Sequence, residues 1–186
     1  MDENLRTLKQ CQRNWAEGSL PRHDITTLYN YVKNIPQQQG TLRYQIIHIQ
    51  NQQAKHDLNH IIMAGDNPKR NANPQVLANE VFLFTINTVE KDSFYVGLAA
   101  GLLAQKAVSI GYKTAFCKCG IYHEHEWKEW LDKYGLDHKK HPQYMAVLGI
   151  GTGLPGKPYG WDITTESQGM IHKSYPVTQP EIDIIK

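Results

Sequence analysis

Cysteine is scarce in this chain. Only 3 of its 186 residues are cysteines, and two of them, Cys117 and Cys119, are separated by a single residue. Three cysteines do not make a framework of disulfide bonds. The chain starts with a charged stretch, Met1 to Asn4, rather than with the basic and apolar regions of a signal peptide. We therefore expect a reduced, cytoplasmic protein.

An excess of charge of one sign is also absent. The 20 lysines and arginines nearly balance the 18 aspartates and glutamates, which gives a net charge of +2 with neutral histidines. Proteins that bind nucleic acid usually carry a strong excess of basic residues. A nucleic-acid partner is therefore not expected.

Long apolar runs, internal repeats and low-complexity linkers are missing as well. The most apolar run, residues 94–110, is interrupted by Lys106 and is short for a bilayer span, so no membrane partner is expected. A chain of 186 residues is long enough to bury a core without disulfides or metals. We therefore predict one domain that comprises residues 1–186.

The same run, residues 94–110, is the feature around which the rest of the chain can be ordered. It is too long and too rich in alanine and leucine to be a strand, so it predicts a helix. Its polar residues Gln105, Lys106 and Ser109 form one narrow stripe, and the remaining circumference is apolar. Such a helix should be buried nearly all round, in a core or in a subunit interface.

The remaining patterns predict strands and helices in alternation. Continuous apolar runs predict strands at 81–86 and 144–150, and shorter patterns predict strands at 43–50 and 113–119. Amphipathic patterns predict helices at 3–11, 24–35, 51–64 and 123–134, with Asp24 as an N-cap. These elements predict an α+β fold with a mixed central sheet of about four to five strands and helices on both faces.

Two motifs suggest cofactors that their surroundings do not favour. Gly151-x-Gly153-x-x-Gly156 follows an apolar strand, as a dinucleotide-binding fingerprint does, but Pro155 and Pro158 prevent the helix that must follow it.

Cys117 and Cys119 with His123 and His125 offer four potential ligands within nine residues. Zinc sites usually separate paired cysteines by two residues, so ordinary strand cysteines and exposed histidines are the favoured interpretation. A metal site stays open as an alternative.

Basic residues near the start of the chain suggest a phosphate. Lys9 and Arg13 are four residues apart in a predicted helix, so they share one face, and Cys11 lies between them. Two cations with a small residue between them could hold a phosphate by charge-assisted hydrogen bonds. A solvated basic face is the alternative interpretation.

Taken together and in order, these features resemble the nitroreductase family, FMN-dependent flavoproteins of α+β fold. Lys9-x-Cys11-x-Arg13 is similar to the family's R-x-S-x-R/K signature, and residues 36–44 are similar to its P-S-x-x-N-x-Q-P-W segment. Residues 97–111 resemble its central helix, which is rich in glycine and alanine. Cys119-Gly120 and Lys173 stand where the family has an acidic-Gly pair and a phosphate-binding basic residue.

The resemblance implies that FMN is held at the interface of a homodimer. Lys9, Arg13 and Lys173 would neutralise the phosphate, the turn at Gln39 would meet the edge of the flavin ring, and a backbone N–H at Gly120 would reach N5. The implied cofactor-binding residues are Lys9, Cys11, Arg13, Gln37, Gln39, Gly40, Cys119, Gly120 and Lys173.

The implied activity is that of an oxidoreductase. NAD(P)H would donate hydride to the flavin, and an electron-poor acceptor such as a nitroaromatic or a quinone would then receive it. No protein acid, base or nucleophile is required, because the flavin carries the chemistry.

Two other hypotheses come from different classes of protein. The substituted signature positions motivate the first, a protein of the same fold that binds or processes flavin without reductase turnover. The second is a non-enzymatic dimeric domain with a Cys/His metal site.

Overall fold

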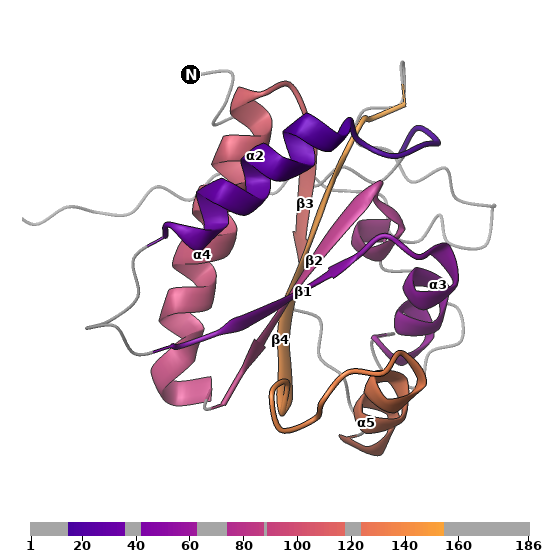
Figure 1. Ribbon diagram of the computed structural model, residues 1–186, viewed down its shortest axis with the longest axis vertical. Coiled ribbons are helices and arrows are strands. Elements are labelled where there is room, and N and C mark those ends of the chain that lie inside the picture. Colours follow the sequence, from indigo (N-terminus) through magenta and orange to yellow (C-terminus); the bar gives the residue numbers. More distant parts are fainter. Residues whose placement is uncertain (1–14, 36–41, 63–73, 88, 118–123, 155–186) are drawn as a thin grey trace, which may run out of the picture.

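A computed structural model describes residues 15–35, 42–62, 74–87, 89–117 and 124–154. Its elements are α2 (Arg22–Lys33), β1 (Gln45–Ile49), α3 (Gln52–Ile61), the short 3₁₀-helix η2 (Pro74–Leu77), β2 (Glu80–Ile86), α4 (Val89–Ser109), β3 (Lys113–Cys117), α5 (Glu124–Lys133) and β4 (Gln143–Gly151). Figure 1 shows the described elements grouped around one sheet.

The four strands form one sheet in the order β1-β2-β4-β3. The pairs β1 with β2, β2 with β4 and β3 with β4 are all antiparallel. The predicted α+β class is therefore confirmed, but the prediction of a mixed sheet is wrong for the described strands. Strands buried on both faces are typical of parallel sheets, yet helices can cover both faces of an antiparallel sheet equally well.

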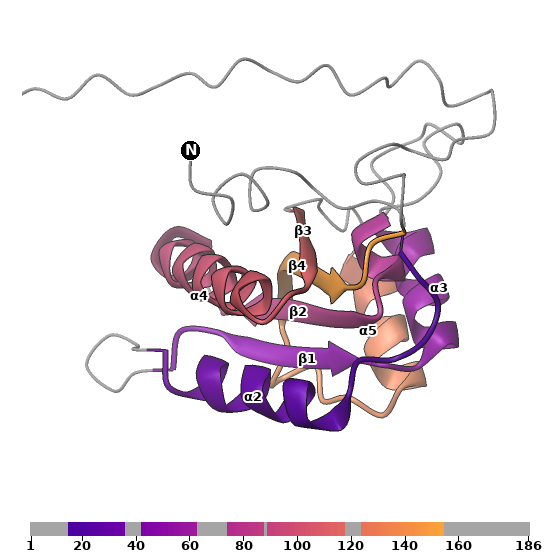
Figure 2. The ribbon, with the colours of Figure 1, turned by 90° about the horizontal axis from the view of Figure 1, so that it is seen from above.

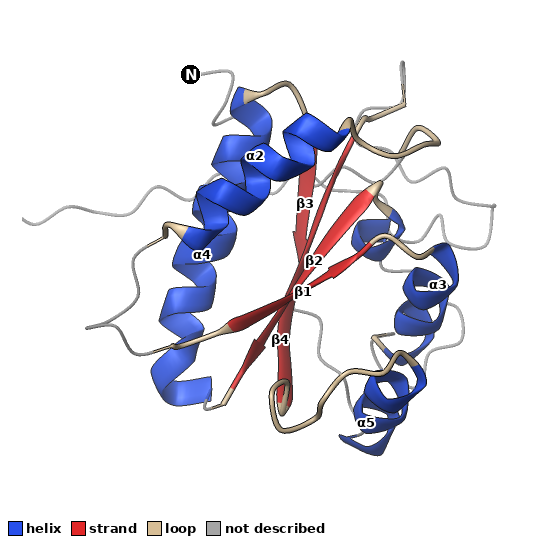
Figure 3. Cartoon of the chain, viewed as in Figure 1, coloured by secondary structure: helices blue, strands red, loops and turns tan. Residues whose placement is uncertain are grey.

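Helices cover both faces of the sheet, as predicted. Helices α2 and α4 lie on one side and α3 and α5 on the other, at the left and right of Figure 1. Figure 2 gives the same arrangement from above, and Figure 3 separates the helices from the strands by colour. The sheet therefore has two cores, one under each pair of helices.

Strand β2 divides its side chains between these two cores. Phe82, Phe84 and Ile86 pack with α2 and α4. Val81 and Leu83 pack with α3 and α5. All seven residues of the strand are buried, which explains why its sequence is a continuous apolar run and does not alternate.

Helix α2 begins earlier than its sequence suggests. It starts at Arg22 after Pro21, so Asp24 lies in the first turn and is not the N-cap. The Asp24 carboxylate instead accepts a hydrogen bond of 2.5 Å from the hydroxyl of Tyr112. An acid in the first turn still stabilises the helix through its dipole. The predicted helix at 3–11 lies outside the described residues.

Helix α4 is buried on one side within this chain. Val96, Ala99 and Leu103 are buried, whereas Phe94 is 70% exposed and Leu98 is 40% exposed. The prediction of burial nearly all round is therefore wrong for the single chain. The exposed side of the helix is therefore apolar at these two positions.

None of the helices in the described ranges is long and apolar enough to span a bilayer.

Candidate functional site

The predicted cofactor-binding residues all lie outside the described ranges: Lys9, Cys11, Arg13, Gln37, Gln39, Gly40, Cys119, Gly120 and Lys173. The structure instead places the residues that adjoin them in the sequence. Those residues show which predicted segments leave the folded domain close together and which leave it far apart.

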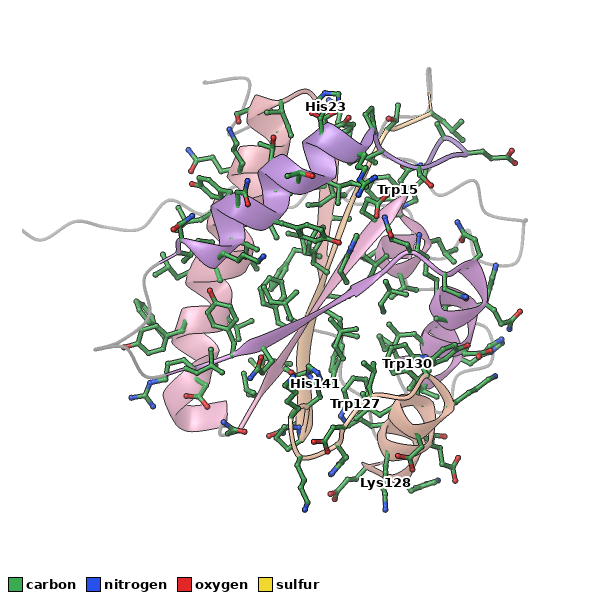
Figure 4. The ribbon with its side chains drawn as sticks, viewed as in Figure 1. Trp15, His23, Trp127, Lys128, Trp130 and His141 are labelled. Carbon is green, nitrogen blue, oxygen red and sulfur yellow. The ribbon has the colours of Figure 1, made fainter. Side chains whose placement is uncertain are left out.

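The first and the last of the described stretches of the chain are paired with each other. Trp15 forms an antiparallel bridge with Gly153. Next to it, the N–H of Ala16 donates a hydrogen bond of 2.8 Å to the carbonyl of Thr152. Trp15 lies beyond the end of β4 at the top of the sheet in Figure 4. Arg13 precedes Trp15 by two residues, whereas Lys173 follows Gly153 by twenty residues, all but the first of which lie outside the described residues.

Asn79 ties this junction to the sheet. Its side-chain nitrogen donates to the carbonyls of Ala16, at 2.9 Å, and Gly18, at 2.6 Å. Its side-chain oxygen accepts from the N–H of Thr152 at 2.9 Å. The residue is 8% exposed and comes directly before β2. One side chain therefore satisfies backbone groups on both incoming segments.

Gly151 leaves room for this side chain. A Cβ at that position would lie 1.9 Å from Oδ1 of Asn79, which is far inside van der Waals contact. Gly151 thus has a packing cause. The described residues end at Leu154, before Gly156, so the rejection of a dinucleotide fingerprint stays a prediction.

Glu80, the next residue, holds the start of β2 to two other stretches directly and to a third through His48. Its carboxylate accepts from the N–H of Leu20 at 3.3 Å and from the side-chain amide of Gln50 at 3.0 Å. Nε2 of His48 lies 2.7 Å from the same carboxylate, and Nδ1 of His48 is hydrogen-bonded to the hydroxyl of Tyr29. Burial would raise the pKa of Glu80, but the hydrogen bonds from His48 and Gln50 outweigh it and lower that pKa.

Lys55 is buried on the opposite face of the sheet from this chain of hydrogen bonds. Its Nζ donates to the carbonyls of Ala78, at 2.8 Å, and Asn79, at 2.6 Å, and the side chain is fully buried. Burial lowers the pKa of Lys55, and the nearby charge of Glu80 partly opposes this shift. The backbone carbonyls just before β2 are therefore hydrogen-bonded by a side chain from α3 as well.

The segments predicted to meet the flavin ring leave from opposite edges of the sheet. Residues 36–41 precede β1, which is one edge strand, and residues 118–123 follow β3, which is the other. Two strands separate these edges, and neighbouring strands lie about 4.8 Å apart, so the edges are roughly 14 Å apart. One chain therefore does not bring these two segments together at the points where they leave the sheet.

A metal site finds no support within the described residues, where no group of three or more His, Cys, Asp or Glu side chains could hold an ion. Cys119 and His123 lie outside those residues, and His125 is exposed on α5. The Cys/His hypothesis therefore stays a prediction.

Comparisons with known proteins identify the fold. No protein-family model and no curated protein matches this chain. Among solved structures, a nitroreductase with bound FMN from Bacteroides fragilis is 13% identical, aligns over 100% of both chains and has a TM-score of 0.67. A BluB-like flavoprotein from Clostridium difficile is 13% identical, with 83% of this chain and 91% of that chain covered and a TM-score of 0.65.

A nitroreductase family protein from Clostridium novyi is also similar. It is 16% identical, with 80% of this chain and 85% of that chain covered and a TM-score of 0.60. The chain thus has the nitroreductase fold, and the predicted resemblance to the nitroreductase family is confirmed at the level of the fold.

Proposed function

We propose that this protein is an FMN-binding oxidoreductase that passes hydride from NAD(P)H to an electron-poor acceptor such as a nitroaromatic or a quinone. The observation that carries this proposal is the pairing of Trp15 with Gly153 in a nitroreductase fold. The pairing brings together two points of the described chain, from which Arg13 is two residues away and Lys173 is twenty residues away along the sequence. When bound, FMN supplies the hydride chemistry, and the protein binds and orients it.

Different residues of the chain would bind different parts of the cofactor. Lys9, Arg13 and Lys173 would neutralise the phosphate through charge-assisted hydrogen bonds, with Cys11 between the first two. Backbone N–H groups at Cys119 and Gly120 would donate to the ring. A second turn, which contains Gln37, Gln39 and Gly40, would contact the edge of the ring.

Two observations favour a homodimer with one cofactor at each end of its interface. The exposed side of α4 carries Phe94 and Leu98, and the glycines beside them, Gly97 and Gly101, have open space where a side chain would be. The two ring-contacting segments leave from opposite edges of the sheet. In the proposed dimer, residues 37–40 of one subunit meet the cofactor held by the other subunit.

The first test is an absorption spectrum of the protein after gel filtration with added FMN. We expect flavin bands to co-elute with protein at the mass of a dimer, and NADH to bleach them under nitrogen. Flavin that co-elutes but is not bleached would favour a flavin-binding or flavin-processing protein without turnover. Protein that leaves FMN in the late fractions would contradict both flavin hypotheses.

A double variant tests the phosphate site. Arg13→Ala with Lys173→Ala should weaken FMN binding at least a hundredfold, because hydrogen bonds to charged groups contribute about 1.5–3 kcal/mol each. Arg22→Ala with Lys128→Ala removes the same charge from two exposed positions and should leave FMN affinity unchanged. Equal affinities in the two double variants would remove this phosphate-site assignment.

Subunit mixing tests the shared site. Gln39→Trp, which adds bulk to the ring-contacting turn, and the Arg13→Ala/Lys173→Ala variant should each fail to bind FMN as homodimers. Unfolding and refolding the two together should restore one intact site in each mixed dimer. A mixture that binds no FMN would mean that each site is built from a single subunit.

A further inference from the structure

We infer that three aromatic side chains, Trp127, Trp130 and Tyr134, form a relay that moves an oxidising equivalent from the buried tryptophans to the tyrosine at the surface. The two tryptophans lie on α5, and Tyr134 directly follows that helix. Radicals derived from peroxide are strong enough one-electron oxidants to attack an indole. Through the relay, their final product would lie on Tyr134 and the core tryptophans would stay intact.

The rings of the relay are close enough to exchange electrons. The ring centroids of Trp127 and Trp130 are 5.4 Å apart and the rings are stacked, and those of Trp130 and Tyr134 are 5.2 Å apart. Both separations lie within the range of about 4.5–7 Å that is usual for aromatic rings in contact. Trp127 is 2% exposed and Trp130 is 4% exposed, whereas Tyr134 is only half-buried. Figure 4 shows both tryptophans on α5.

The surface end of the relay has a base for the proton that a phenol loses when it is oxidised. The hydroxyl of Tyr134 donates to the carboxylate of Asp57 on α3. Asp57 also accepts from Nζ of Lys133 at 2.6 Å and from the side-chain amide of Gln53 at 2.9 Å. These hydrogen bonds, that of Lys133 above all, lower the pKa of Asp57, so its carboxylate is ionised at neutral pH. An oxidised phenol is a strong acid and gives its proton even to a weak base.

The buried end has no such base. Tyr144 contacts Trp127, with ring centroids 6.2 Å apart, but its buried hydroxyl has no hydrogen-bond partner among the described residues. Burial also raises the pKa of Tyr144. The indole N–H groups of Trp127 and Trp130 donate to the backbone carbonyls of His141 and Ala54, which are poor proton acceptors. Packing alone does not require the two ends to differ, and this difference gives the relay its direction.

The steps balance in electrons and protons. The oxidant takes one electron from an indole of the pair and is itself reduced. Tyr134 then gives one electron to that indole, which returns to its original state, and gives its hydroxyl proton to Asp57. The products are a neutral tyrosyl radical at the surface and a protonated carboxyl group.

The test starts the reaction at tryptophan in the purified full chain. An ultraviolet laser pulse, at a wavelength that tryptophan absorbs and tyrosine does not, photoionises the indoles, and hexaamminecobalt(III) in solution takes up the ejected electrons. Time-resolved absorption then follows the tryptophanyl and tyrosyl radicals. In the wild-type protein we expect part of the tryptophanyl signal to convert into a tyrosyl signal.

Two variants test the surface end, each shown to be folded by circular dichroism. Tyr134→Phe should lose at least half of the conversion, since two of the 4 tryptophans belong to the relay. Asp57→Asn keeps Tyr134 but removes the base, so it should slow that part of the conversion at least tenfold; a positioned base typically contributes about 10²–10⁴-fold.

Tyr144→Phe is the matched control, because it makes the same change at the other end of the tryptophan pair. It removes a hydroxyl without a partner among the described residues, so the fold and the conversion should both be unchanged. Conversion that is undiminished in Tyr134→Phe would overturn the relay, and so would an equal loss in Tyr144→Phe. An unchanged rate in Asp57→Asn would show that the carboxylate is not the base.

Discussion

The two ends of β2 are held by different means, although both ends are fully buried. At the start of the strand, the side chains of Asn79 and Glu80 bond to several separate stretches of chain, and Lys55 bonds to the backbone between them. At the other end, Thr85 shares one hydrogen bond of 2.9 Å with Nδ1 of His141. Figure 4 shows His141 and Trp127 at that lower end, opposite Trp15.

The difference follows from the kind of chain that arrives at each end. Residues 15–20 and 152–154 contain no helix or long strand, so their partly buried backbone groups need partners that regular structure does not supply. Buried side chains with several hydrogen-bonding atoms provide those partners. The lower end of β2 is stabilised mainly by side-chain packing and by a hydrogen bond of 2.9 Å from Nε1 of Trp127 to the carbonyl of His141. Polar side chains are thus concentrated at the end of β2 where residues 15–20 and 152–154 attach.

The largest expected effect comes from Glu80→Ala. This change leaves the N–H of Leu20 and the side chains of Gln50 and His48 without their acceptor in a buried position. We expect the free energy of unfolding in urea to fall by about 3 kcal/mol or more. Glu80→Gln, which keeps an acceptor oxygen, should lose less. Equal losses in these two variants would mean that volume, and not hydrogen bonding, holds this end.

Thr85→Val probes the lower end at nearly constant volume. It leaves the buried ring of His141 without the partner of its Nδ1 atom, so we expect a loss of about 1–2 kcal/mol in the same urea measurement. A loss as large as that of Glu80→Ala would erase the contrast between the two ends of β2.

Tyr112→Phe tests a hydrogen bond that also lies at the upper end of the sheet, just before β3. It removes the hydrogen bond from Tyr112 to Asp24 of α2, and we expect a loss of about 1 kcal/mol. Burial and the Asp24 carboxylate raise the pKa of Tyr112 to about 12. Spectroscopic titration of the wild-type protein should therefore show a tyrosine with that pKa, and the titration of Tyr112→Phe should lack it. If both proteins show this tyrosine, the assignment to Tyr112 is wrong.

The smallest effect is a pH dependence that arises at the lower end. Burial, helped by Lys140, lowers the pKa of His141 below its ordinary value of 6.5. The unfolded chain therefore binds this proton at a higher pH than the folded protein does, and stability should fall as the pH drops through that ordinary value. The loss is complete below the folded-state pKa.

A histidine variant isolates this contribution. The difference in unfolding free energy between wild type and His141→Asn should shrink between about pH 7.5 and about pH 5.5, by an amount on the order of 1 kcal/mol. A constant difference for His141→Asn would contradict a lowered pKa.

Much of the fold could be read from the pattern of apolar residues. The nearly continuous apolar run at 81–86 predicted a central strand because burial on both faces favours apolar residues at every position, and β2 spans Glu80–Ile86. The run at 144–150 likewise became β4, and the alanine-rich run became α4. The strand directions were predicted wrongly because a continuous apolar run indicates only that both faces of a strand are buried. It does not indicate whether the strand is parallel or antiparallel to its neighbours.

No pattern in the sequence predicted the contacts that Asn79 makes. A single asparagine before a strand is common in loops, and its partners lie more than sixty residues away in the sequence. A lysine in an amphipathic helix normally points to water, so the burial of Lys55 could not be foreseen either. These side chains are buried only because distant segments supply their partners.

The sequence by itself determined the class of fold, the positions of the described strands along the chain, and the basic residues proposed for a phosphate. These features depend on local periodicity and on residue type. Only the tertiary structure decided that the strands are antiparallel, that one face of α4 is left exposed and that Asn79 joins two distant segments. Each of these depends on contacts between residues far apart in the chain, which local patterns do not encode.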